Sequence, residues 1–163
     1  MTRRYRIELL GKHDRATFAS GSDTLDRYLR EQAGQDMRRR VASCFVAVDE
    51  TGTIAGFYTI AASSLAMDLL PAEQAKSLPR YPVIPAVLPG RLAVAQAHQG
   101  KRLGAALVAD ALLRATRADV MAHAMIVDAK DEQAARFYEH LGFARLIDDR
   151  RRLIRSLLAV ANE

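Results

Sequence analysis

A short apolar run, a glycine-spaced basic loop and a long apolar segment follow one another between Arg91 and Ala118. The run "RLAVAQA" is typical of a central strand, and the segment from Lys101 to Ala118 is apolar on nearly every side, as in a covered helix. A second apolar run, "MAHAMIVDA", follows and again indicates a buried strand. This order of strand, helix and strand predicts a mixed α/β domain.

The loop between the first strand and the helix carries Gly100 and Gly104 on either side of Lys101 and Arg102. The first amides of a helix have no partner inside the helix, and the helix dipole adds partial positive charge there. Glycine has no Cβ, so a ligand can approach its backbone closely. The loop therefore indicates a cradle for an anion such as a phosphate or pyrophosphate. The spacing matches neither the P-loop nor the dinucleotide-binding glycine pattern, so a helix start with a relaxed turn stays open as an alternative.

Strands are also predicted at Tyr5–Leu10, in a hairpin on either side of Asp49–Gly52, and in "RRLIRSLLAV" near the C-terminus. The stretch "PRYPVIPAVLPG" holds four prolines, which predicts an irregular connection rather than a regular element.

Helices are predicted from a cap at Ser22 or Asp23 to about Met37, in "LPAEQAKSL", and from a cap at Asp131 to Gly142. No repeat or linker interrupts these segments. The sequence therefore predicts one domain over residues 1–163.

The composition is that of an ordinary globular chain, in which half of the residues are apolar and 26% are charged. No apolar run reaches the roughly 18 residues of a membrane span, and the basic N-terminus lacks the apolar core of a signal peptide. The one cysteine, Cys44, lies in the apolar run "CFVAV", which predicts a buried, inert thiol. The four histidines show no metal-ligand spacing. A soluble, cytoplasmic protein that binds no metal is expected.

The charge is strongly biased, because a net charge of +5 comes with clusters of arginine. Arginine forms bidentate bonds with phosphate and stacks on bases, so the clusters are compatible with a nucleic-acid partner. A solvated, arginine-rich surface, partly paired with acids such as Asp148 and Asp149, is the alternative. The candidate nucleic-acid contacts are Arg3, Arg4, Arg38, Arg39, Arg40, Arg150 and Arg151.

The junction "QGKRLGA", followed by "FYEHLGF" about 34 residues later, resembles the GNAT superfamily of N-acetyltransferases over essentially the whole chain. The resemblance implies a central mixed sheet flanked by helices and acetyl-CoA as the cofactor. It implies that Leu92, Ala93 and Val94 hydrogen-bond the pantetheine arm. The amides of Gln99, Gly100, Lys101, Arg102, Leu103, Gly104 and Ala105 would hold the pyrophosphate.

Two positions depart from the pattern of the superfamily. Arg102 replaces the first glycine of the motif, and we expect ordinary helical dihedrals there because arginine adopts a positive φ only at a cost. Asp131 stands where many members have asparagine before the "FYEHLGF" helix. With Ala135, it completes the set of cofactor-binding residues that the resemblance implies.

Tyr138, in "RFYEHLGF", is the candidate catalytic residue. A phenol with a pKa near 10 stays protonated at neutral pH and can donate to charge that develops on sulfur. The resemblance implies direct attack by the amine in a ternary complex, with Tyr138 as the general acid to the CoA thiolate. Packing of Tyr138 in the core beside Phe137 and Leu141 is the alternative.

No general base is evident; His98 could shuttle a proton, but a surface position is the simpler interpretation. An α-amino group, with a pKa near 8, is already partly neutral at pH 7, whereas a lysine amine is not. The missing base therefore favours an α-amine as the acceptor.

Within the superfamily, "FASGSDTLDRYLREQA", "PRYPVIPAVLPGRLAV" and "FYEHLGF" resemble the tRNA-acetylating toxins of type II toxin–antitoxin modules. This likeness implies that the acceptor is the α-amine of aminoacyl-tRNA, that the protein is a homodimer, and that a ribbon-helix-helix antitoxin neutralises it. Two alternatives stay open. One is acetylation of a protein N-terminus, a lysine or a small-molecule amine, and the other is a non-catalytic module that binds CoA or nucleic acid.

Overall fold

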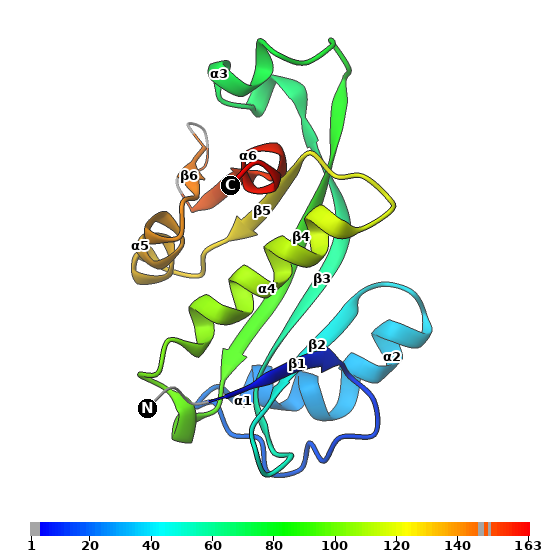
Figure 1. Ribbon diagram of the computed structural model, residues 1–163, viewed down its shortest axis with the longest axis vertical. Coiled ribbons are helices and arrows are strands. Elements are labelled where there is room, and N and C mark those ends of the chain that lie inside the picture. Colours follow the sequence, from blue (N-terminus) through cyan, green and yellow to red (C-terminus); the bar gives the residue numbers. More distant parts are fainter. Residues whose placement is uncertain (1–3, 147–148, 150) are drawn as a thin grey trace. The chain divides into compact units, whose positions relative to one another are not determined.

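The computed structural model describes residues 4–146, 149 and 151–163 (Figure 1). Of the predicted nucleic-acid contacts, Arg3 and Arg150 lie outside the described residues. The strands are β1 (Arg6–Leu9), β2 (Ser43–Val48), β3 (Ile54–Ala66), β4 (Val83–Val94), β5 (Ala124–Asp128), β6 (Ala144–Arg145) and β7 (Arg152–Ser156). The α-helices are α1 (Asp23–Arg27), α2 (Ala33–Arg38), α3 (Ala72–Ala75), α4 (Leu103–Arg117), α5 (Glu132–His140) and α6 (Leu157–Ala161). A π-helical segment, η1 (Tyr28–Gln32), joins α1 to α2, and 3-10 turns lie at η2 (Met67–Leu69) and η3 (Gln96–His98).

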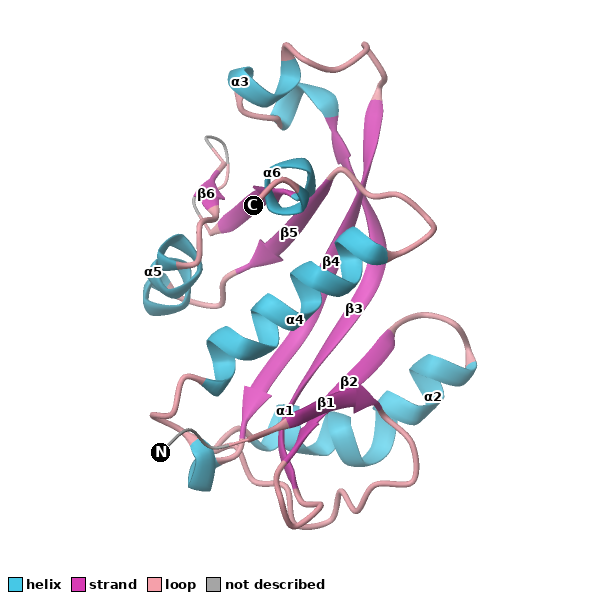
Figure 2. Cartoon of the chain, in the orientation of Figure 1, coloured by secondary structure: helices cyan, strands magenta, loops and turns pink. Residues whose placement is uncertain are grey.

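The strands form a seven-stranded mixed sheet in the order β1-β2-β3-β4-β5-β7-β6. β4 and β5 are parallel, with Ala86 opposite Ala124, whereas β1 and β2, β2 and β3, β5 and β7, and β6 and β7 are antiparallel. The parallel pair needs a long crossover, and α4 lies in the connection between β4 and β5. The predicted strand–helix–strand order is therefore confirmed (Figure 2).

The chain divides into two compact units, each made of two separate stretches. Unit 1 comprises residues 1–61 and 90–111, and unit 2 comprises residues 62–89 and 112–163. β3, β4 and α4 each supply residues to both units. The two units interleave along the chain, and the structure does not decide between one domain and two. One domain over residues 1–163 therefore stays a prediction.

In unit 1, α2 of the helical run from α1 to α2 packs against β2 (Figure 1). Ser22, one of the two predicted caps, is the N-cap of this run. Its hydroxyl accepts a hydrogen bond from the Leu25 amide at 3.3 Å. The core beneath it is apolar and includes Leu29, Val46 and Phe57, none of which is exposed. Cys44 lies in this core with 1% of its surface exposed, which confirms the predicted buried thiol.

Unit 2 has its own core, centred on Ala124, Ile126 and Ile154. In this unit α5 leads into β6 and then β7, and α6 ends the chain. The predicted C-terminal strand is only half right, because β7 ends at Ser156. The Ser156 hydroxyl accepts from the Ala159 amide at 3.3 Å and so caps α6.

Most of the proline-rich stretch is a strand and not the irregular connection that we predicted, because β4 begins at Val83 and includes Pro85 and Pro89. Only residues 79–82, before the strand, are irregular. Proline removes a donor from the sheet but keeps its carbonyl. That of Pro85 accepts from the His123 amide at 2.9 Å, and the next two residues, Ala86 and Val87, pair with β5. Pro85 is thus tolerated in the strand because its carbonyl is used as an acceptor and the residues after it pair with β5. Among the described residues no helix is long and apolar enough to cross a bilayer.

Candidate acetyl-CoA site and Tyr138 helix

The loop before α4 leaves six successive amides without a partner among the described residues. The Gln99 amide donates to the Gln96 carbonyl at 3.3 Å, and the next helical bond of the segment runs from Ala106 to the Arg102 carbonyl at 3.1 Å. Between them, no amide from Gly100 to Ala105 donates to an acceptor in the described part of the chain. Such a row of donors at a helix start can bind an anion.

Two residues of the loop have left-handed backbones: Gly100 with a φ of 79° and Arg102 with a φ of 62°. The prediction of ordinary helical dihedrals at Arg102 was therefore wrong. Because a chain that enters α4 after this turn needs a left-handed residue at that point, Arg102 adopts the conformation of the glycine that it replaces. It keeps the turn and adds an exposed guanidinium.

Side chains fix the loop to the end of β4. The Gln99 amide group donates to the Val94 carbonyl at 3.0 Å and to the Ser20 carbonyl at 2.9 Å. Lys101 Nζ donates to the Ala97 carbonyl at 3.3 Å. The structure thus joins the predicted pyrophosphate loop to the end of the predicted pantetheine strand, Leu92 to Val94, by side-chain hydrogen bonds within unit 1.

His98, immediately before this loop, is buried with 6% of its surface exposed. Its Nδ1 lies 2.8 Å from the Tyr5 hydroxyl, and its Nε2 lies 3.4 Å from Asp49 Oδ2. The expected surface position was therefore wrong. With both ring nitrogens engaged, His98 anchors the loop to Tyr5, the residue before β1, and to the β2–β3 turn.

Tyr138 lies on α5 between two aromatic rings. Its ring contacts Phe137 and Phe143 edge-on, at centroid distances of 5.1 and 5.5 Å. The hydroxyl makes no hydrogen bond to any residue that the structure describes, and burial raises the pKa of the phenol. Packing thus orients the ring and leaves a neutral O–H donor for another molecule, so the two interpretations of Tyr138 are compatible.

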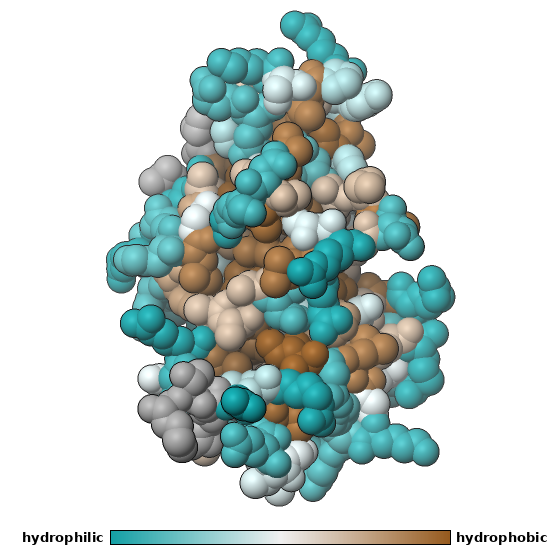
Figure 3. Space-filling model, in the orientation of Figure 1, coloured by the Kyte–Doolittle hydropathy of each residue, from teal (hydrophilic) through white to brown (hydrophobic). Residues whose placement is uncertain are grey.

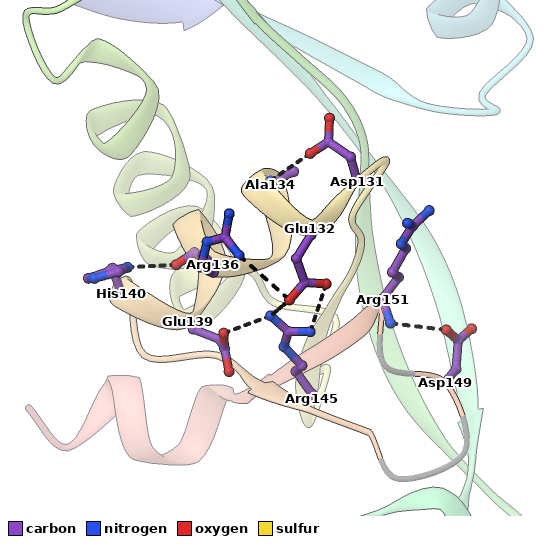
Figure 4. Close-up of polar contacts among 9 residues, drawn as sticks. All are labelled: Asp131, Glu132, Ala134, Arg136, Glu139, His140, Arg145, Asp149 and Arg151. Carbon is purple, nitrogen blue, oxygen red and sulfur yellow. Dashed lines mark hydrogen bonds and ion pairs between the residues drawn. The ribbon is translucent and has the colours of Figure 1, made fainter.

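A charged cluster clamps α5 to β6 (Figure 4). Arg145 of β6 donates to Glu132 at 2.6 and 3.1 Å and to Glu139 at 3.0 Å, two residues that lie seven apart on α5. The Arg145 side chain is only 10% exposed, and its hydrogen bonds with Glu132 lower the pKa of that carboxyl. The clamp spans nearly the whole helix and so fixes the element that carries Tyr138.

A family model described as acetyltransferase (GNAT) domain matches residues 40–145, which include β4, the amide loop, α4 and α5. The chain belongs to the GNAT acetyltransferase family. A curated relative, the tRNA-acetylating toxin of Mycobacterium tuberculosis, is 34% identical over 132 residues, which are 80% of this chain and 78% of the relative. The predicted resemblance and the predicted fold class are thereby confirmed.

Solved structures of toxins share the GNAT fold of this chain over nearly its full length. AtaT complexed with acetyl-methionyl-tRNAfMet has a TM-score of 0.90 and 28% identity, and the match covers 98% of each chain. A mutant of AtaT bound to the C-terminus of the antitoxin AtaR and to acetyl-CoA has a TM-score of 0.81 and 25% identity, covering 97% of this chain and 96% of the other.

The two remaining predicted cofactor residues of the GNAT domain are engaged within α5. Asp131 is its N-cap, because Oδ1 accepts from the Ala134 amide at 2.8 Å. Ala135 is fully buried, and its amide donates to the Asp131 carbonyl at 3.1 Å. Contact of either residue with a cofactor stays a prediction. Both lie with Tyr138 in unit 2, whereas the loop and Leu92–Val94 belong to unit 1.

The described candidate arginines for nucleic-acid contact are all exposed: Arg4, Arg38, Arg39, Arg40 and Arg151. None of them forms an ion pair within the part of the chain that is described, although the Arg151 guanidinium donates to the Lys130 carbonyl at 3.4 Å. In the view of Figure 3, long hydrophilic side chains project from many points of the surface. Residues 4–146, 149 and 151–163 contain no group of acidic, histidine or cysteine side chains suited to a metal.

Sequence reasoning missed Arg91 and Tyr28, which the structure brings together in unit 1. The Arg91 guanidinium carbon lies 3.8 Å from the centroid of the Tyr28 ring. The two residues are 63 positions apart, so no local pattern could have paired them.

Proposed function

We propose that this protein transfers the acetyl group of acetyl-CoA to the α-amine of an aminoacyl-tRNA, and that it acts as the toxin of a toxin–antitoxin module. The row of unpartnered amides from Gly100 to Ala105 carries the proposal, because it is built for a polyanionic group. Lys101 and Arg102 are exposed beside it and add positive charge.

The acceptor is proposed from the relatives and from the chemistry of the chain. The curated relative is a tRNA-acetylating toxin, and an AtaT structure holds acetyl-methionyl-tRNAfMet. An α-amine near pKa 8 needs little help from a base, in keeping with His98, whose two ring nitrogens are engaged. The net charge of +5 suits a polyphosphate partner.

When bound, acetyl-CoA supplies an activated acyl group as a thioester. The amides of the loop hold its pyrophosphate, and Leu92, Ala93 and Val94 hydrogen-bond its pantetheine arm. The acceptor nitrogen would attack the thioester carbon directly, so that the N–C bond forms as the C–S bond breaks, and Tyr138 would donate its phenolic proton to the leaving sulfur. The proton that the nitrogen loses would pass to water, and the phenolate would regain a proton from water. Burial keeps that phenol protonated, because it raises the pKa of Tyr138 above its ordinary value.

The partners of the protein are proposed on the same basis. The relative AtaT binds the C-terminus of the antitoxin AtaR. The family resemblance extends this to a ribbon-helix-helix antitoxin that would neutralise the chain, and to a homodimer that would act in the cytoplasm.

The test is an acceptor competition with the purified protein and labelled acetyl-CoA. We expect label in the aminoacyl ester fraction of charged tRNA, no label in the same tRNA after deacylation, and little label in a polyamine or a lysine peptide. Charged tRNA that stays unmodified while the peptide or polyamine is acetylated would refute the proposed acceptor. Induced expression is expected to arrest growth, and normal growth would contradict the toxin assignment.

A further inference from the structure

Arg91, near the C-terminal end of β4, is an exposed cation that the fold holds against a ring. Its guanidinium carbon lies 3.8 Å from the centroid of Tyr28. Within residues 4–146, 149 and 151–163, its side chain makes neither an ion pair nor a hydrogen bond. The donors of this guanidinium are therefore available to a ligand.

The Tyr28 ring, on which the Arg91 guanidinium rests, is held in place by burial, a hydrogen bond and a ring contact. Tyr28 is 3% exposed, its hydroxyl donates to Asp36 Oδ2 at 2.7 Å, and its ring stacks on Phe57 at 6.2 Å with an interplanar angle of 16°. Tyr28 is also the first residue of η1, the π-helical turn between α1 and α2. Such turns interrupt α-helices frequently at functional sites. A stacked guanidinium loses less freedom when it binds, so the pair is pre-organised.

The position of Arg91 along β4 indicates which ligand it binds. This inference rests on the proposed function. The loop at Gly100–Ala105 holds the pyrophosphate, and the pantetheine arm runs back along Val94, Ala93 and Leu92. The acetyl-bearing end of the arm therefore points toward the residue before Leu92. That residue is Arg91, so the acceptor must arrive beside it.

We propose that Arg91, supported by Tyr28, binds a backbone phosphate near the aminoacylated 3′ end of the acceptor RNA. The aminoacyl ester itself carries no negative charge, and the nearest charges of the acceptor are the phosphates of its last nucleotides. A guanidinium offers a planar fork of donors that matches a phosphate in a bidentate manner. A lysine ammonium has neither the fork nor the flat surface that rests on Tyr28.

The experiment measures binding of the full chain to a fluorescent RNA hairpin that ends in the single-stranded 3′ tail of a tRNA. Arg91→Gln and Arg91→Lys are each expected to weaken binding by about tenfold or more, since a charge-assisted bidentate contact is lost. Arg91→Gln should also lower the slope of log affinity against log salt by about 0.7. Arg117→Gln removes an equally exposed charge at the end of α4 and is the matched control, expected to change affinity by less than about twofold.

Three outcomes would overturn the inference: no binding of the hairpin by the unmodified protein, unchanged affinity of Arg91→Gln, or an equal loss in Arg117→Gln. A fourth is a comparable loss of CoA affinity in Arg91→Gln by calorimetry, which would assign the phosphate to the cofactor. The binding assay needs no acetyl transfer. Failure of the proposed function would appear in the acceptor competition instead, so the two failures are distinguishable.

Discussion

Two arginines, Arg40 and Arg102, have left-handed backbones, with φ values of 60° and 62°. This conformation costs a residue with a Cβ roughly 1–2 kcal/mol. Arg40 ends the turn after α2, where its amide donates to the Met37 carbonyl at 3.1 Å. At Arg102 the strain places a cation at the start of α4, beside the amides of Gly100–Ala105, which have no partner in the described part of the chain. There the positive charge adds to the attraction for an anion.

Arg102→Gly should separate the strain from the charge. Glycine adopts a positive φ freely, so we expect the free energy of unfolding to rise by about 0.5–1 kcal/mol. CoA affinity should fall by about three- to tenfold, because one cation near the phosphates is lost. Urea denaturation and calorimetry measure the two effects. A variant that binds CoA as tightly as the unmodified chain would show that Arg102 lies away from the phosphates.

Tyr138→Phe tests the proposed role of Tyr138 as the general acid. The phenylalanine ring keeps the edge-on contacts with Phe137 and Phe143, whereas the proton donor disappears. We expect kcat to fall by roughly 10²–10⁴-fold, with CoA affinity within about twofold. Because burial raises the pKa of Tyr138, ionisation of this phenol should not reduce kcat below about pH 10. Undiminished turnover in steady-state kinetics would remove Tyr138 from the mechanism.

At the scale of elements, the short helix α5 is held at its ends by capping residues and along its length by ion pairs. Asp131 caps its first turn, and Gly142, with a φ of 93°, follows its C-cap residue Leu141. Arg145 holds its outer face through Glu132 and Glu139. The position of Tyr138 thus depends on polar contacts that surround a short helix of nine residues.

The cap can be tested without touching the aromatic contacts. Asp131→Ala should lower the free energy of unfolding by about 1 kcal/mol, since the Ala134 amide loses its acceptor. Asp131→Asn, which introduces the residue that the superfamily pattern has here, should lower the free energy of unfolding by no more than a few tenths of a kcal/mol, because asparagine caps equally well. Urea denaturation of the two variants and the unmodified protein measures these differences. Equal stability of all three would show that the Asp131 cap does not stabilise the protein.

The sequence predicted correctly those features that depend on residues close together in the chain. Ser22, Asp131 and Gly142 were identified as helix ends because capping involves residues within a few positions of one another. The strand character of the proline-rich stretch could not be predicted, since it depends on pairing between Ala86 and Ala124, 38 residues later. Likewise, the left-handed turn at Arg102 follows from the path into α4 and is not a preference of arginine.

At the scale of the whole molecule, buried acidic groups determine how stability responds to alkaline pH. Burial raises the pKa of Cys44 to about 12 and also raises that of Tyr138. In the unfolded chain a thiol ionises near pH 8.5, while the folded chain keeps its proton. The unfolded state then binds fewer protons, so stability is unaffected below about pH 8.5 and falls as pH rises.

We therefore expect the free energy of unfolding to fall by about 1.4 kcal/mol per pH unit from about pH 9. Cys44→Ala should be less stable at neutral pH, because it leaves a small cavity, but should lose this slope between pH 9 and 10. Urea denaturation across that range measures both. An identical slope in the two proteins would mean that Cys44 ionises in the folded state.

The interleaving of the two units has a consequence for a nascent chain. Unit 1 lacks its β4 residues and the start of α4 until Ala111 has been made, and unit 2 lacks β7 until Ser156 has been made. Co-translational folding of the first 61 residues alone would leave their apolar core without its later partners. Under the function proposed above, a ribosome would finish synthesising this chain before the product could act on translation.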